Sequence, residues 1–129
     1  MSKHETPMTH WYWQQVGGTL IPEFCAVRRS RSCASRLLDA VIVIGGPRVI
    51  ARQADVSVEG KDIIVVQAKA SRLGMYLMGQ AFFSAQLMRP FKPRSVESIA
   101  LVLLDDTVLR PLFEQYTGMR VVVCPAADV

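Results

Sequence analysis

The chain has 129 residues, half of them hydrophobic and 20% charged, and this composition excludes a disordered or highly acidic segment. A chain of this length predicts one domain whose core is large enough to fold without disulfides or a structural metal. The formal net charge of +4 favours partners that carry phosphate groups.

The cysteines and the N-terminus indicate a cellular setting. Three cysteines, an odd number without C-x-x-C spacing, argue against a disulfide scaffold or a zinc knuckle and favour the reducing cytoplasm. The polar N-terminus lacks the apolar segment of a signal peptide, and the longest uncharged stretch is too short and too polar to span a membrane. We therefore expect a cytoplasmic protein that does not enter a membrane.

The hydrophobic pattern predicts a flexible tail over residues 1–9 and a single domain over residues 10–129. Residues 54–58 are compatible with either a short strand or a loop. Within the domain we expect, in chain order, a short helix at 10–15, strands at 19–27, 37–44 and 62–68, a helix at 75–88, a strand at 96–104, a helix capped by 105–107 and ending near 116, and a strand at 119–124.

This order predicts a mixed α/β sheet flanked by helices. Three strands joined without a predicted helix favour an antiparallel meander, and the helix at 75–88 favours a crossover to a parallel strand. If that helix has an apolar face wider than the sheet covers, we expect a homodimer.

Polar residues inside the apolar strands mark the place where chemistry is expected. Asp39 interrupts the strand at 37–44. Gln67 lies in the strand at 62–68 and Lys69 directly follows it, so their side chains, two residues apart, point to the same face. A metal ion held by carboxylate and carbonyl-type oxygens would offset the cost of burying the charge, and an adjacent amine could position a water. Glu23 could supply a second carboxylate. The alternative is a solvated or Arg36-paired Asp39 and a Lys69 that extends into water.

The segments RLLDAVI at 36–42 and IVVQAK at 64–69 resemble the PD-(D/E)XK, or restriction-endonuclease-like, nuclease superfamily. The predicted order of helix, three-stranded meander, helix and strand is similar to the core of that superfamily. Two positions depart from its pattern: Leu38 precedes Asp39 where a proline is common, and Gln67 replaces the usual acid. The Q-x-K form resembles the Mrr-type branch of restriction nucleases.

The resemblance implies a role for each matching residue. Asp39 would be the central ligand of Mg²⁺ or Mn²⁺, and Gln67 and the backbone carbonyl of Ala68 would be further ligands. Lys69 would orient the attacking water and stabilise charge on the phosphate. Glu23 would be the upstream acid that completes the catalytic and metal-binding set, with Glu5 as the second choice because it falls in the predicted tail.

Nucleic-acid contacts are expected from basic residues. Four arginines fall in or beside the loop at 28–35, namely Arg28, Arg29, Arg31 and Arg36, and a second basic cluster comprises Arg89, Lys92 and Arg94. Gln80 resembles a helix glutamine that several branches direct at the active site, but it could equally lie on a solvent-facing side. The aromatic run at 11–13 could stack on bases, although packing against the core is the preferred interpretation.

Together these features predict a metal-dependent nuclease that hydrolyses phosphodiester bonds, with DNA favoured over RNA. The alternative function is a catalytically inactive module that keeps the nuclease fold and binds protein or nucleic acid. A third interpretation is an unrelated α+β domain in which the strand-borne acid and lysine simply pair.

Overall fold

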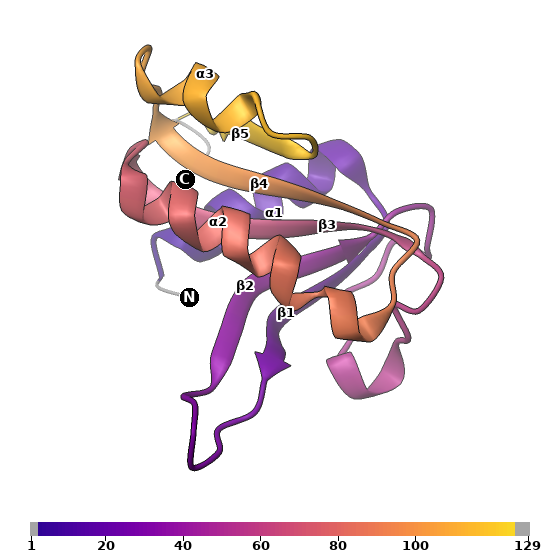
Figure 1. Cartoon of the computed structure of the whole chain (residues 1–129). Helices are drawn as coiled ribbons and strands as arrows, with labels where there is room; N and C mark the ends of the chain where they lie inside the picture. Colours follow the sequence, from indigo (N-terminus) through magenta and orange to yellow (C-terminus); the bar gives the residue numbers. More distant parts are fainter. Residues whose placement is uncertain (1–2, 126–129) are drawn as a thin grey trace.

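The computed structural model of the chain describes residues 3–125 and contains a five-stranded mixed sheet flanked by helices (Figure 1). The elements follow the expected order. The helices are α1 (Glu5–Val16), α2 (Met75–Leu87) and α3 (Leu109–Glu114); the strands are β1 (Thr19–Val27), β2 (Arg36–Val43), β3 (Asp62–Arg72), β4 (Ser95–Leu104) and β5 (Met119–Val123); the short 3₁₀ turns are η1 (Gln53–Asp55) and η2 (Arg89–Phe91).

The strands lie in the order β1-β2-β3-β4-β5. β1, β2 and β3 form an antiparallel meander, and α2 then crosses over to place β4 parallel to β3. α3 makes a second crossover, after which β5 pairs in parallel with β4. The mixed sheet, the meander and the parallel crossover expected from the sequence are therefore confirmed.

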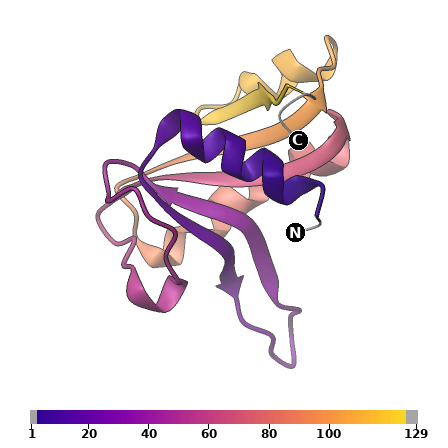
Figure 2. The same cartoon turned by 180° about the vertical axis from the view of Figure 1, so that it is seen from behind.

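Both faces of the sheet are covered, because consecutive residues of its central strands, which point to opposite faces, are buried alike. α1 packs on one face, where Met8 and Tyr12 join strand residues such as Ile42 and Val66 (Figure 2). α2 and α3 cover the opposite face, where the side chains of Leu77, Ala81, Ala85 and Phe113 meet those of β4 and β5. The sheet therefore has a hydrophobic core on each of its two faces.

The N-terminal helix is longer than the sequence pattern indicated. α1 begins at Glu5, so residues 5–9 of the expected flexible tail are helical, and Met8 and Thr9 are buried. Pro7 is compatible with this start because proline is tolerated in the first turn of a helix. Residues 1–2 of the expected tail lie outside the described residues.

One open alternative is decided, and two other boundaries differ from expectation. Residues 54–58 form the end of η1 and a loop, and not a strand. β3 extends beyond the apolar run to Arg72, because Lys69 and Arg72 continue the pairing with β4. The third helix is only six residues long, although Asp106 Oδ1 accepts hydrogen bonds from the backbone N–H groups of Val108 and Leu109, as a capping acid should.

The helix α2 has an exposed apolar side in addition to its buried one. Met88, just after it, is fully buried, but Met75 is 74% exposed. Tyr76 and Phe83 are also exposed. Across residues 3–125, no helix has both the length and the apolar character needed to cross a membrane.

Candidate functional site

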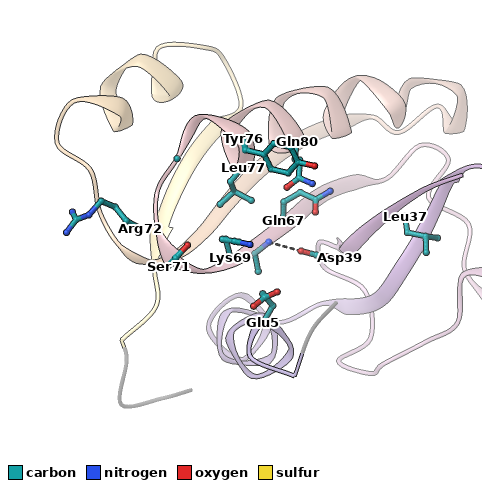
Figure 3. A pocket seen from close by; sticks show the side chains of 12 residues that line it. Glu5, Leu37, Asp39, Gln67, Lys69, Ser71, Arg72, Tyr76, Leu77 and Gln80 are labelled. Carbon is teal, nitrogen blue, oxygen red and sulfur yellow. Dashed lines mark hydrogen bonds between the residues drawn. The ribbon is translucent and has the colours of Figure 1, made fainter. Parts of the chain in front are cut away.

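The candidate site lies where β2 and β3 separate. Their pairing ends at Ala40 and Val66, while β2 continues alongside β1 as far as Arg36. This divergence opens a gap between β2 and the end of β3, and the N-terminal turns of α1 and α2 border it from the two faces of the sheet (Figure 3). A pocket of about 360 Å³ fills the gap; it is lined by Glu5, Leu37, Asp39, Gln67, Ala68, Lys69, Ser71, Arg72, Gly74, Tyr76, Leu77 and Gln80.

Asp39 takes the place of the missing strand pairing. Its Oδ2 accepts a hydrogen bond of 2.8 Å from the backbone N–H of Ala68. Because N–H and C=O of one strand residue point the same way, the carbonyl of Ala68 faces the same gap. Within residues 3–125, no residue donates a hydrogen bond to Asp39 Oδ1. Every side-chain oxygen that is fully buried among these residues has a hydrogen-bond partner. Asp39 Oδ1 is therefore not fully buried, and it is open to the pocket.

Burial raises the pKa of the Asp39 carboxyl above its usual value. The hydrogen bond from Ala68 lowers the pKa, but the negative charges of Glu5 and Glu23 raise it further. The net increase means that the folded protein holds a carboxylate that would gain from a neighbouring cation.

Gln67 is buried, with only 6% of its surface exposed. Its Nε2 donates a hydrogen bond of 2.8 Å to Ser84 Oγ on α2, which fixes the orientation of the amide. Its Oε1 accepts no hydrogen bond from the residues described. Because every fully buried side-chain oxygen among them has a partner, Oε1 is not fully buried and also reaches the pocket. The amide therefore presents an oxygen, not a nitrogen, to the gap.

Lys69 is exposed at the pocket rim and forms no ion pair with any acid of residues 3–125. It lines the same pocket as Asp39. Within the same residues Asp39 forms no ion pair with Arg36 either, so the expected alternative of a simple pair does not describe this site. Gln80 also lines the pocket, from the second turn of α2.

The structure places the two candidate upstream acids differently. Glu5 lines the pocket from the first turn of α1. Glu23 is exposed in β1, at a left-handed backbone position with φ of 50°, opposite the Asp39 level of β2 but outside the pocket lining. Burial is the main cause of the raised pKa of Asp39, and the negative charge of Glu23 is a small further contribution. Glu5 is thus the better-placed second carboxylate.

The four arginines Arg28, Arg29, Arg31 and Arg36 lie on the hairpin that joins β1 to β2, which extends away from the body of the domain (Figure 1). All four are exposed, and none forms an ion pair within the described chain. Arg36 stands at the start of β2, closest in sequence to the pocket. The hairpin is therefore an uncompensated positive surface beside the site.

The second basic cluster does not border the site. Arg89 and Lys92 follow the far end of α2, and Arg89 is about 14 Å along the helix from Gln80 of the pocket, given a rise of about 1.5 Å per residue. Arg94 is paired with Asp62, and the guanidinium lowers the pKa of that carboxyl to about 2. This cluster stabilises the turn before β4 and leaves the hairpin as the basic surface near the pocket.

The N-terminal aromatic residues pack as preferred from the sequence. Tyr12 is buried on the sheet, and Trp11 and Trp13 are partly buried against the same cluster. Trp13 Nε1 donates a hydrogen bond of 2.8 Å to the carbonyl of Gly18. Base stacking by this run would require unpacking α1.

Sequence reasoning missed several pocket residues. Ser71 and Arg72 were missed because they follow the apolar run, although β3 continues through them. Arg72 is held by a hydrogen bond of 2.6 Å from its Nη1 to the carbonyl of Asp105. Tyr76 lies two residues after Gly74, and an exposed aromatic at a helix start carries no pattern that identifies it. The available signal was the pair of hydrogen-bond donors, Ser71 and Arg72, directly after the apolar run of the strand.

No cluster of three or more His, Cys, Asp or Glu side chains suited to a metal occurs within residues 3–125, so any metal site here would need amide or backbone oxygens. Comparison of the chain with models of known protein families and with curated protein sequences gives no match.

Proposed function

We propose that the chain is a metal-dependent nuclease of restriction-endonuclease-like fold that hydrolyses phosphodiester bonds, in DNA rather than RNA. The observation that carries the proposal is the common pocket of Asp39, Gln67 and Lys69 at the divergence of β2 and β3. The order of helix, antiparallel meander, crossover helix and parallel strand, similar to the core of that superfamily, supports it.

The chemistry of the donor set fits Mg²⁺ or Mn²⁺. Asp39 Oδ1 and Gln67 Oε1 are open to the pocket, the Ala68 carbonyl faces the same gap, and Glu5 lines it. These are all oxygen donors, which such cations prefer. Asp39, Gln67 and Ala68 would hold the ion, with Glu5, or Glu23 after a side-chain movement, as the second acid.

The chain's own residues then have distinct tasks. A bound divalent cation supplies Lewis-acid stabilisation of the phosphate and a lower pKa for water. Lys69, unpaired within the described chain, offers its ammonium to a phosphate oxygen and to the attacking water. The first turn of α2 opens onto the pocket, and its free N–H groups favour an anion there.

Removing the Lys69 amine tests the activity. Lys69→Ala should lower nicking of supercoiled plasmid DNA in Mg²⁺ or Mn²⁺ by about a hundredfold or more, because a positioned donor to the developing charge is lost. The melting temperature should stay within experimental error, since the side chain is exposed. Lys61→Ala, an exposed lysine at the other end of β3, is the matched control and should keep full activity. Full activity of Lys69→Ala would remove this lysine from the mechanism.

A catalytically inactive binding module is the second candidate, and the neutral Gln67 favours it. A neutral amide leaves one negative charge fewer to hold a divalent cation. Titration with Mg²⁺ or Mn²⁺, followed by thermal shift, separates the candidates. A rise in melting temperature that Asp39→Ala abolishes supports the nuclease, whereas no rise at millimolar metal supports the module.

A further inference from the structure

A second hollow adjoins the candidate site. It has a volume of about 810 Å³ and runs between the exposed side of α2 and the start of β2. Leu37, Gln67, Tyr76 and Gln80 line both the pocket and this hollow, which we call the α2 groove. A molecule lying along the groove would therefore lead directly to Asp39 and Lys69.

The walls of the α2 groove expose aromatic rings to solvent. Tyr76 is 82% exposed and Phe83 is 64% exposed. Seven residues separate them, so they share one side of the helix about 10 Å apart along its axis, which spans about three stacked nucleotides. Exposed apolar surface of this kind marks an interaction site when it lines a groove.

Gly79 keeps the space between the two rings open. A Cβ atom added at this glycine would meet no atom within 4 Å, so a side chain there would project into the groove and not into the fold. The position thus offers a way to fill the groove without disturbing the core.

The charges beside the α2 groove favour a polyanion. α2 contains no charged residue. The β1–β2 hairpin next to it has no acid between Val27 and Leu38, and its four arginines are unpaired within the described chain. Two copies of the chain joined through this surface would bring two such hairpins together, and their like charges would oppose the contact.

We infer that the α2 groove binds single-stranded nucleic acid, with unpaired bases stacked on Tyr76 and Phe83 and the backbone held by the hairpin arginines. In a duplex the faces of the bases are covered by their neighbours, so exposed rings gain stacking only from an unpaired strand. Cleavage of the bound strand rests on the proposed function, because the groove would deliver that strand to the pocket. The substrate of the nuclease would then be an unpaired segment.

The test measures binding without cleavage. Fluorescence anisotropy in EDTA compares a fluorescein-labelled 15-nucleotide thymidine strand with the same strand annealed to its complement. We expect the single strand to bind at least about tenfold more tightly, since each stacked base contributes the equivalent of about five- to hundredfold in affinity. Equal affinity for the two, or tighter binding of the duplex, would overturn the inference.

Variants locate the binding surface. Tyr76→Ala should weaken single-strand binding by about five- to hundredfold, whereas Tyr76→Phe, which keeps the ring, should preserve it. Gly79→Leu should weaken binding without lowering the melting temperature, because leucine is the better helix former. Tyr116→Ala removes another exposed tyrosine, beyond α3 and outside the groove, and should leave binding unchanged.

Other outcomes are separable. Unchanged single-strand affinity in both Tyr76→Ala and Gly79→Leu would overturn the inference even if Lys69-dependent cleavage persists. A sedimentation coefficient that falls in Tyr76→Ala, without loss of DNA binding, would instead identify the groove as a contact between two copies. Tyr76-dependent binding without any metal-dependent cleavage would support the groove and contradict the nuclease.

Discussion

At the scale of single residues, Asp39 combines two roles that oppose each other. One oxygen holds the Ala68 N–H beyond the point where β2 and β3 stop pairing, and the other opens into the pocket. Burial raises the pKa of this carboxyl, so keeping it ionised costs the folded state free energy. A position that destabilises the fold and lines a pocket is a sign of selection for function.

Replacing this acid by its neutral amide should reveal the cost. Asp39→Asn keeps an oxygen that can accept from Ala68 but carries no charge. The pKa of Asp39 is raised in the folded state from an unfolded value of about 3.9, so between these two pKa values the native state binds more protons and the wild type loses stability as pH rises. We expect the variant to be as stable as or more stable than the wild type at neutral pH, and to lose that advantage below a pH of about 3.9.

Urea unfolding at a series of pH values measures this difference. Asp39→Ala, which cannot accept from Ala68, is the control and should be less stable than Asp39→Asn at every pH. A neutral-pH stability of Asp39→Asn well below that of the wild type would mean that the charge itself stabilises the fold.

At the scale of elements, the β1–β2 hairpin is a positively charged surface separate from the ion pairs of the domain. Its arginines form no ion pairs within residues 3–125, unlike Arg94 and Arg110, which pair with acids of the domain. It projects beyond the sheet (Figure 1), and its residues Ser35 and Arg36 line the α2 groove. Its position suits contact with a nucleic-acid backbone more than packing against the rest of the domain.

The hairpin should determine how strongly salt weakens binding. Each phosphate contact to a single strand contributes about 0.7 to the slope of log affinity against log salt, so the triple change of Arg28, Arg29 and Arg31 to alanine should lower the slope by about 2. Anisotropy titrations at several salt concentrations give the slopes. Lys61→Ala with Lys92→Ala, which changes two exposed lysines outside the groove lining, should leave the slope close to the wild-type value; an equal fall in both variants would deny the hairpin a specific role.

The elements also show how far sequence reasoning reaches. The core of β3 was predictable because its run of β-branched residues after a turn favours a strand. α1 was underestimated because its first turns are polar, and only packing on the sheet makes Met8 and Thr9 buried. Asp39, Gln67 and Lys69 were identifiable as polar residues inside apolar strands, but the choice of Glu5 over Glu23 depends on where α1 docks, which no local pattern encodes.

At the scale of the whole molecule, the sheet supports the site from both faces. α1 brings Glu5 to the pocket from one face and α2 brings Gln80 from the other. The pocket therefore exists only when both helices are docked. Stability and site assembly should change together.

Loosening α1 tests this connection. Met8 is fully buried among Leu20, Ile42 and Val66, so Met8→Ala should lower the free energy of unfolding by about 2–5 kcal/mol, measured in urea. Met75→Ala, at an exposed methionine, should change it by less than about 0.5 kcal/mol. If α1 docking completes the pocket, Met8→Ala should also reduce the rise in melting temperature that Mg²⁺ produces.

The hydrogen bond between Ala68 and Asp39 provides a reporter of the site's state. An amide proton bound to a carboxylate changes its resonance when that carboxylate gains a proton or a cation, so a single peak in a ¹⁵N–¹H spectrum should follow the site. Its pH profile would measure the pKa of Asp39 directly, and its response to Mg²⁺ would show occupancy without any substrate. A backbone amide that lines the pocket can thus report on the chemistry that occurs there.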